Sequence, residues 1–231
     1  NKSSSGGLTM MTANAGDAGI SGTLIMSTGT ASAGDSGKMW IGSGDATTGH
    51  GGDIVVTVGT GNYGVGGSLI LSSGKSTGGD SGKVFLGSNE SSSGKGGDVV
   101  VTVGSGSSIG GSLVLSSGLA GGGDSGAIYL GTHSAVGGHG GDIEVNVGTG
   151  NSGAGGNIII KAGQTTAAAN TNESTGGQIT ITTGQSTTAS SGHFIVTTPN
   201  AGSAGVSGDI TLSTGDATAG NSGGLYLGSG D

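Results

Sequence analysis

Three regularly spaced aspartates are the residues of this chain best suited to binding a metal ion. Asp35, Asp80 and Asp124 each stand between a glycine and a Ser-Gly pair, at intervals of 45 and 44 residues. Carboxylate oxygens are preferred Ca²⁺ ligands, and a cation would relieve repulsion within a column of like charges. The Gly-Gly-x-Gly-x-Asp nonapeptide of calcium-binding β-rolls is missing. Capping of turns through backbone N–H groups is the preferred interpretation, and calcium stays an alternative.

A second position carries a basic or titratable side chain three residues before an aspartate. Its occupants are His50, Lys95 and His139, followed by Asp53, Asp98 and Asp142. The two histidines are too far apart in the repeat to converge on one zinc ion, so we expect solvated side chains loosely paired with aspartate. His133 and His193 lie elsewhere, and no spacing assembles a nucleophile, a base and a carboxylate. We therefore expect no enzyme activity and no cofactor.

A threonine column is the third feature with chemical potential. It contains Thr12, Thr57, Thr102 and Thr197, with Asn146 at the equivalent position of one repeat. Regular ranks of threonine can bind ice or carbohydrate, but the residue two positions earlier is not a second threonine. A structural threonine ladder within a sheet explains the same residues.

Three sequons for N-glycosylation are present, at Asn1, Asn89 and Asn172. Asn89 replaces a loop glycine, and Asn172 lies in an insertion near 165–175 where an exposed loop could carry a glycan. Their placement favours a secreted glycoprotein.

The composition excludes several classes of protein. Of 231 residues, 59 are Gly, one is Pro and none is Cys, and the net charge is −8. Such a chain has no basic face for a nucleic acid, and no apolar run is long enough to span a membrane as a helix. Gly does not occur at every third position, so the chain is not collagen, and recurrent apolar triplets argue against plain disorder.

One unit of about 15 residues recurs from Gly7 to the end of the chain. Each unit has an opening glycine, a polar residue, a short apolar segment, another glycine and a loop. The opening glycines are Gly7, Gly22, Gly37, Gly52, Gly67, Gly82, Gly97, Gly111, Gly126, Gly141, Gly156, Gly177, Gly192, Gly208 and Gly223.

The apolar segments fall into three families that alternate and so create a superperiod of 45 residues. The first family includes 38–41, 83–86, 127–130 and 224–227; the second 53–58, 98–103 and 142–147; and the third 68–73, 112–117 and 157–162. β-Branched residues bounded by glycine predict strands, whereas this density of glycine is incompatible with helices.

The superperiod predicts an all-β fold, a parallel β-solenoid with three 15-residue units per 45-residue coil and about five coils. Equivalent residues would then stack about 4.8 Å apart. Trp40, Phe85, Tyr129 and Tyr226 would form an aromatic ladder, interrupted by Thr180. A 15-residue coil remains the competing geometry. We expect a lead-in at 1–6 and one continuous domain at 7–231, which is part of a longer array of repeats.

Residues 207–223 read Ser-Gly-Asp-Ile-Thr-Leu-Ser-Thr-Gly-Asp-Ala-Thr-Ala-Gly-Asn-Ser-Gly. This pattern resembles the Gly/Ser/Thr-rich tandem repeats of large secreted and cell-surface proteins of diatoms and other microalgae, and the resemblance extends over nearly the whole chain from Gly7. It implies an extracellular, wall-associated or fibre-forming role and transfers no catalytic residue.

We therefore expect a structural protein that forms a rigid extracellular rod, filament or cell-surface fibre by end-to-end or lateral self-association. The alternative is a surface adhesin, or a solenoid that binds ice or carbohydrate. Neither expectation requires a nucleic acid or a membrane span.

Overall fold

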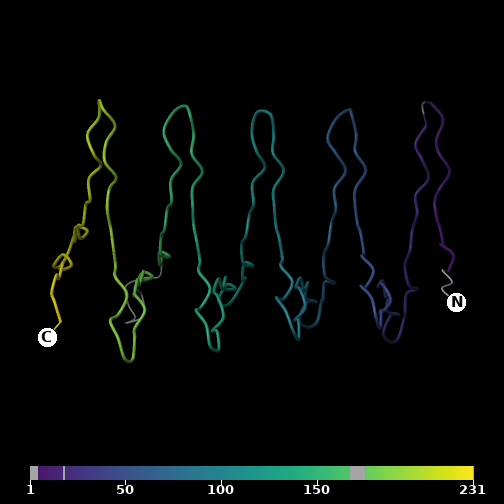
Figure 1. Cartoon of the computed structure of the whole chain (residues 1–231), viewed down its shortest axis with the longest axis horizontal. Helices are drawn as coiled ribbons and strands as arrows, with labels where there is room; N and C mark the ends of the chain where they lie inside the picture. Colours follow the sequence, from purple (N-terminus) through teal and green to yellow (C-terminus); the bar gives the residue numbers. More distant parts are fainter. Residues whose placement is uncertain (1–4, 18, 167–174, 231) are drawn as a thin grey trace. The chain divides into compact units, whose positions relative to one another are not determined.

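The structure is a computed structural model that describes residues 5–17, 19–166 and 175–230. These residues contain no helix and no strand; the chain is coil interrupted by short bends and turns. Figure 1 accordingly draws the described chain as a plain trace without arrows or helical ribbons. The predicted all-β fold is therefore wrong, and so is the parallel β-solenoid with a 45-residue coil.

The reason lies in burial. The chain exposes 23219 Å² of surface, whereas a globular protein of this mass exposes about 9,000 Å² and its fully unfolded chain about 31,000 Å². No described residue is buried. The segments have the residue types of strands, but a sheet also needs neighbours that pair their backbones and cover one face. The described segments have no such neighbours.

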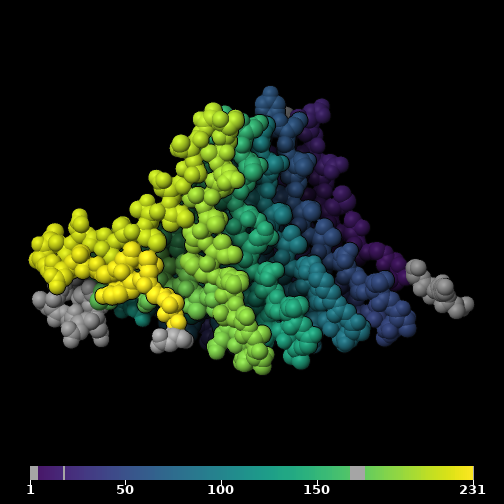
Figure 2. Space-filling view, turned by 60° about the vertical axis from the view of Figure 1, so that its left-hand side comes forward, coloured from purple at the N-terminus to yellow at the C-terminus, as the bar shows by residue number. Residues whose placement is uncertain are grey.

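Contacts within the chain divide it into two units, Asn1–Leu115 and Ser116–Asp231. In each unit, extended apolar segments alternate with glycine-rich loops, and Figure 2 draws the same chain in space-filling form with the colours of the sequence. The insertion predicted near 165–175 falls largely outside the described residues. The boundaries of the predicted domain stay predictions.

The recurring element of local structure is a loop that closes on itself. The opening glycine of a unit lies against the residue that ends the preceding segment, and we call this contact a neck. In the first unit, Gly82 N–H donates to the Gly74 carbonyl at 3.0 Å and Gly111 N–H to Gly104 at 3.1 Å. In the second unit, Gly192 N–H donates to Gly184 at 2.9 Å. Each of these loops spans seven or eight residues along the chain.

Side-chain hydroxyls close other necks. Four donate to the carbonyl of the next opening glycine: Thr12 to Gly22 at 3.1 Å, Thr28 to Gly37 at 3.1 Å, Ser88 to Gly97 at 2.6 Å and Thr132 to Gly141 at 2.9 Å. The residue that ends a segment therefore helps to hold the loop that follows it.

Close approach explains why three of the units open with glycine. A Cβ atom at Gly67, Gly111 or Gly156 would lie 2.7, 2.5 or 2.6 Å from the Cγ1 atom of Val58, Val103 or Val147. Carbon atoms prefer separations of about 3.5–4.0 Å, so any side chain would force the neck apart. These three valines end the three second-family segments. The 45-residue superperiod is thus a property of the necks as well as of the apolar residues.

Loop conformation also repeats. Gly64 and Gly153, at equivalent places two superperiods apart, have φ values of 72° and 75°, which L-residues rarely adopt. Within three other loops a serine hydroxyl accepts backbone N–H groups: Ser76 from Gly79 at 3.0 Å, Ser91 from Gly94 at 3.0 Å and Ser186 from Ala189 at 2.9 Å. Such bonds bend a loop locally and so lower the entropy lost when its neck closes.

The closed state of each neck is only marginally stable. Closing a flexible loop of eight residues costs about 2 kcal/mol from its length dependence alone, and one hydrogen bond contributes about 0.5–1.5 kcal/mol net. Together, the neck bond and the serine bonds roughly offset this cost. We infer that small perturbations open individual loops.

Substitution of neck glycines tests the requirement for close approach. In Gly111→Ala, the Val103 methyl group must move by about 1 Å to restore an ordinary contact, so the neck opens. The nuclear Overhauser effect between the Val103 methyl protons and the residue 111 amide proton should be lost. Gly110→Ala is the matched control, because a Cβ there meets nothing within 4 Å. Equal loss in both variants would contradict the account.

A disulfide tests neck geometry directly, because the chain has no cysteine of its own. A Cβ at Gly192 would lie 3.6 Å from Thr183 Cβ, close to the roughly 3.8 Å separation found in disulfides. Thr183→Cys/Gly192→Cys should therefore oxidise at least several-fold more readily in a glutathione buffer than Thr180→Cys/Ala189→Cys. The control pair has the same sequence separation, but no neck joins it. Equal oxidation would show that the loop is not closed.

Candidate functional site

The candidate calcium ligands do not converge. Asp35, Asp80 and Asp124 are all exposed. Over the described ranges there is no group of three or more His, Cys, Asp or Glu side chains that could hold a metal ion. The structure also shows no pocket in this part of the chain. The arrangement offers neither a coordination shell nor an enclosed place for a substrate.

Calcium titration checks this arrangement. Isothermal calorimetry of the dilute chain should show no saturable binding in the roughly 10⁻⁷–10⁻⁵ M range of calcium sensors, because isolated carboxylates bind Ca²⁺ weakly. A saturable site that is lost in Asp80→Asn, and kept in the control Asp45→Asn outside this column, would contradict the expectation.

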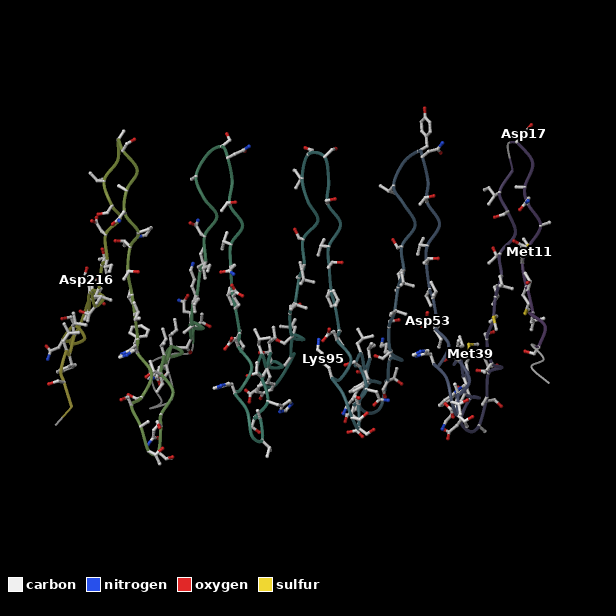
Figure 3. All side chains as sticks on the ribbon, in the orientation of Figure 1. Met11, Asp17, Met39, Asp53, Lys95 and Asp216 are labelled. Atoms are coloured by element: carbon white, nitrogen blue, oxygen red, sulfur yellow. The ribbon has the colours of Figure 1, made fainter. Side chains whose placement is uncertain are left out.

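The side chains three residues before the second-family aspartates are exposed to solvent. Lys95 Nζ lies 2.8 Å from Asp98 Oδ2, with the two side chains 79% and 65% exposed. A pair this open to solvent stabilises by at most about 1 kcal/mol. His50 and His139 are also exposed, and the structure places neither in an ion pair in the part of the chain that it describes. Figure 3 labels Lys95 on its segment.

The aromatic residues of the first family are the most exposed side chains of their segments. Trp40, Phe85, Tyr129 and Tyr226 are each more than 90% exposed. Three of the rings lie close to the backbone of a nearby glycine: a Cβ would lie 3.1 Å from Trp40 Nε1 at Gly42, 2.9 Å from Phe85 Cε1 at Gly87 and 2.7 Å from Tyr226 Cε2 at Gly224. The predicted aromatic ladder depended on stacked strands, which the described residues lack.

The second-family segments are open on both sides. Ile54, Val55 and Val56 are 55%, 78% and 66% exposed, and Val99, Val100 and Val101 have nearly the same exposed fractions. In the third copy Glu144 takes the position of Val55 and accepts a hydrogen bond from the Asn146 side chain. Thr57 and Thr102 of the threonine column are exposed as well.

Of the three sequons, Asn89 lies in the described part of the chain, whereas Asn1 and Asn172 fall outside it. Asn89 is exposed, and its backbone carbonyl accepts the Gly97 N–H at 3.3 Å. Ser91 of the same sequon accepts the Gly94 N–H at 3.0 Å. A glycan at Asn89 would thus stand at the base of a closed loop and stays a prediction.

Sequence reasoning missed the necks, although a signal for them exists. In most units the opening glycine follows the last residue of the preceding segment by nine positions, as in Val58 to Gly67 and Thr214 to Gly223. A constant interval between a segment end and a glycine indicates a contact between the two.

The described residues include no helix long and apolar enough to cross a membrane. No family model, curated protein or solved structure matches this chain. The resemblance to microalgal repeat proteins therefore stays a prediction. The exposed apolar segments and the necks are the features of the molecule that bear on its function.

Proposed function

We propose that this chain is a structural repeat protein of an extracellular or cell-surface fibre, in which its apolar segments are covered by other copies of the same chain. The observation that carries this proposal is the regular exposure of apolar segments along both units, with no buried residue in the part of the chain that is described.

The hydrophobic effect supplies the driving force. Full burial of one Val, Leu or Ile side chain stabilises by about 1.5–3 kcal/mol. Each apolar segment offers several such side chains, and segments recur about every 15 residues. Covering one segment therefore outweighs the cost of closing the adjoining loop, so association and loop closure support each other.

A second copy is the best-matched occupant. It presents the same three families of segment at the same 45-residue interval, so one register aligns every segment with its equivalent. Only 9% of residues are charged, which limits the repulsion produced by a net charge of −8. Aromatic residues recur at 45-residue intervals in the first family, with Thr180 as the exception, and can pair across the contact.

A surface that binds glycan or ice is the second candidate. Exposed rings such as Trp40 and Tyr129 could stack on sugars, and exposed threonines could meet ice. Retention on a polysaccharide column, or thermal hysteresis, by chains kept monomeric would favour this candidate over self-association.

Sedimentation velocity over a range of concentrations tests the self-association. The chain should form large species as concentration rises, and emission from Trp40, its one tryptophan, should shift to the blue as the ring is covered. Val55→Ser/Val100→Ser should raise the concentration needed at least tenfold, because two side chains lose their burial energy.

The matched control is Val65→Ser/Val136→Ser, which makes the same two changes at exposed loop positions. It should associate as the unmodified chain does. A chain that stays monomeric at all concentrations would refute self-association, and equal effects of the two double variants would refute the role of the segments.

A further inference from the structure

We propose that the chain acts as an extensible tether. Residues within a closed loop do not contribute to the end-to-end length, and they are released when tension opens the neck. This function differs from self-association: it belongs to the single chain and does not require a fibre.

Each neck bridges two points of the same chain with few contacts. The Gly184–Gly192 neck is held by one N–H···O bond of 2.9 Å, and the Gly74–Gly82 neck by one of 3.0 Å. No loop residue between these glycines is buried. Tension applied through the segments on either side therefore acts on the neck hydrogen bond, because the loop residues make no buried contacts that would also resist opening.

The necks occur in series. They occur at eleven of the fifteen opening glycines, as backbone hydrogen bonds, hydroxyl hydrogen bonds or valine contacts. An eight-residue loop extends to roughly 27 Å, so opening one neck adds about 24 Å to the path between its ends. Several necks opening one after another would extend the chain stepwise.

The three kinds of neck should open at different forces. Gly67 and Gly156 meet Val58 and Val147, and no hydrogen bond joins either pair in the described structure. The Ser88–Gly97 neck has both a hydroxyl bond of 2.6 Å and a backbone bond, from Gly97 N–H to the Asn89 carbonyl. Valine necks should open at lower force than this doubly bonded neck.

Force measurements on single chains held by their ends test the proposal. The variant Thr183→Cys/Gly192→Cys is pulled oxidised and then reduced. If the neck is closed at rest, the two curves coincide at low force and separate by about 25 Å above a threshold force, when the reduced loop opens.

The unmodified chain, which has no cysteine, is the control, and oxidising conditions should leave its curve unchanged. If the oxidised and reduced curves of Thr183→Cys/Gly192→Cys instead differ from the lowest force upward, the loop is open without load and the proposal is overturned. The measurement uses isolated chains, so its outcome is independent of whether the protein associates.

Discussion

The approach of most opening glycines to the end of the preceding segment is the contact on which the local structure depends. Where that segment ends in valine, the space available excludes even a methyl group, as at Gly67 and Gly111. Where a Ser or Thr stands at or just after the segment end, its hydroxyl bonds to the glycine carbonyl in four cases, among them Thr132. Glycine is thus required by proximity at these positions, and its freedom of φ matters chiefly within loops, as at Gly64.

The second constraint is that no residue is buried in the part of the chain that the structure describes. Its segments are held extended between closed loops, with apolar side chains directed to solvent. In an isolated neck the closed and open states are close in free energy, because the entropic cost of closing the loop is similar to the stabilisation from one or two hydrogen bonds. Contacts with other chains would shift this balance toward closed loops, and tension would shift it back. Association and extensibility therefore follow from the same marginal closure.

The repeat itself could be read from the sequence, including the 15-residue unit and the three alternating families. Positions that are equivalent in sequence share a local environment, as the matching exposures of Val55 and Val100 show. The fold class could not be obtained in this way. β-Branched residues favour an extended backbone, but sheet formation depends on pairing between distant segments, which local composition does not determine.

The calcium alternative depended on the same long-range pairing. Asp35, Asp80 and Asp124 were expected to share a column because strands were expected to stack, and the described residues have neither strands nor a group of three or more His, Cys, Asp or Glu side chains that could hold a metal ion. The pairing expected at Lys95 depends on three-residue spacing alone, and it is present. Short-range contacts followed from sequence, whereas long-range ones did not.

Residue-resolved amide hydrogen exchange of the dilute chain, followed by NMR, tests the central claim most directly. The account predicts slowed exchange at the neck amides of Gly82, Gly126 and Gly192, and fast exchange through the apolar segments between them. Protection that runs continuously through residues 54–58 and 99–103 would mean that these segments are paired with neighbours in the single chain, and would contradict it.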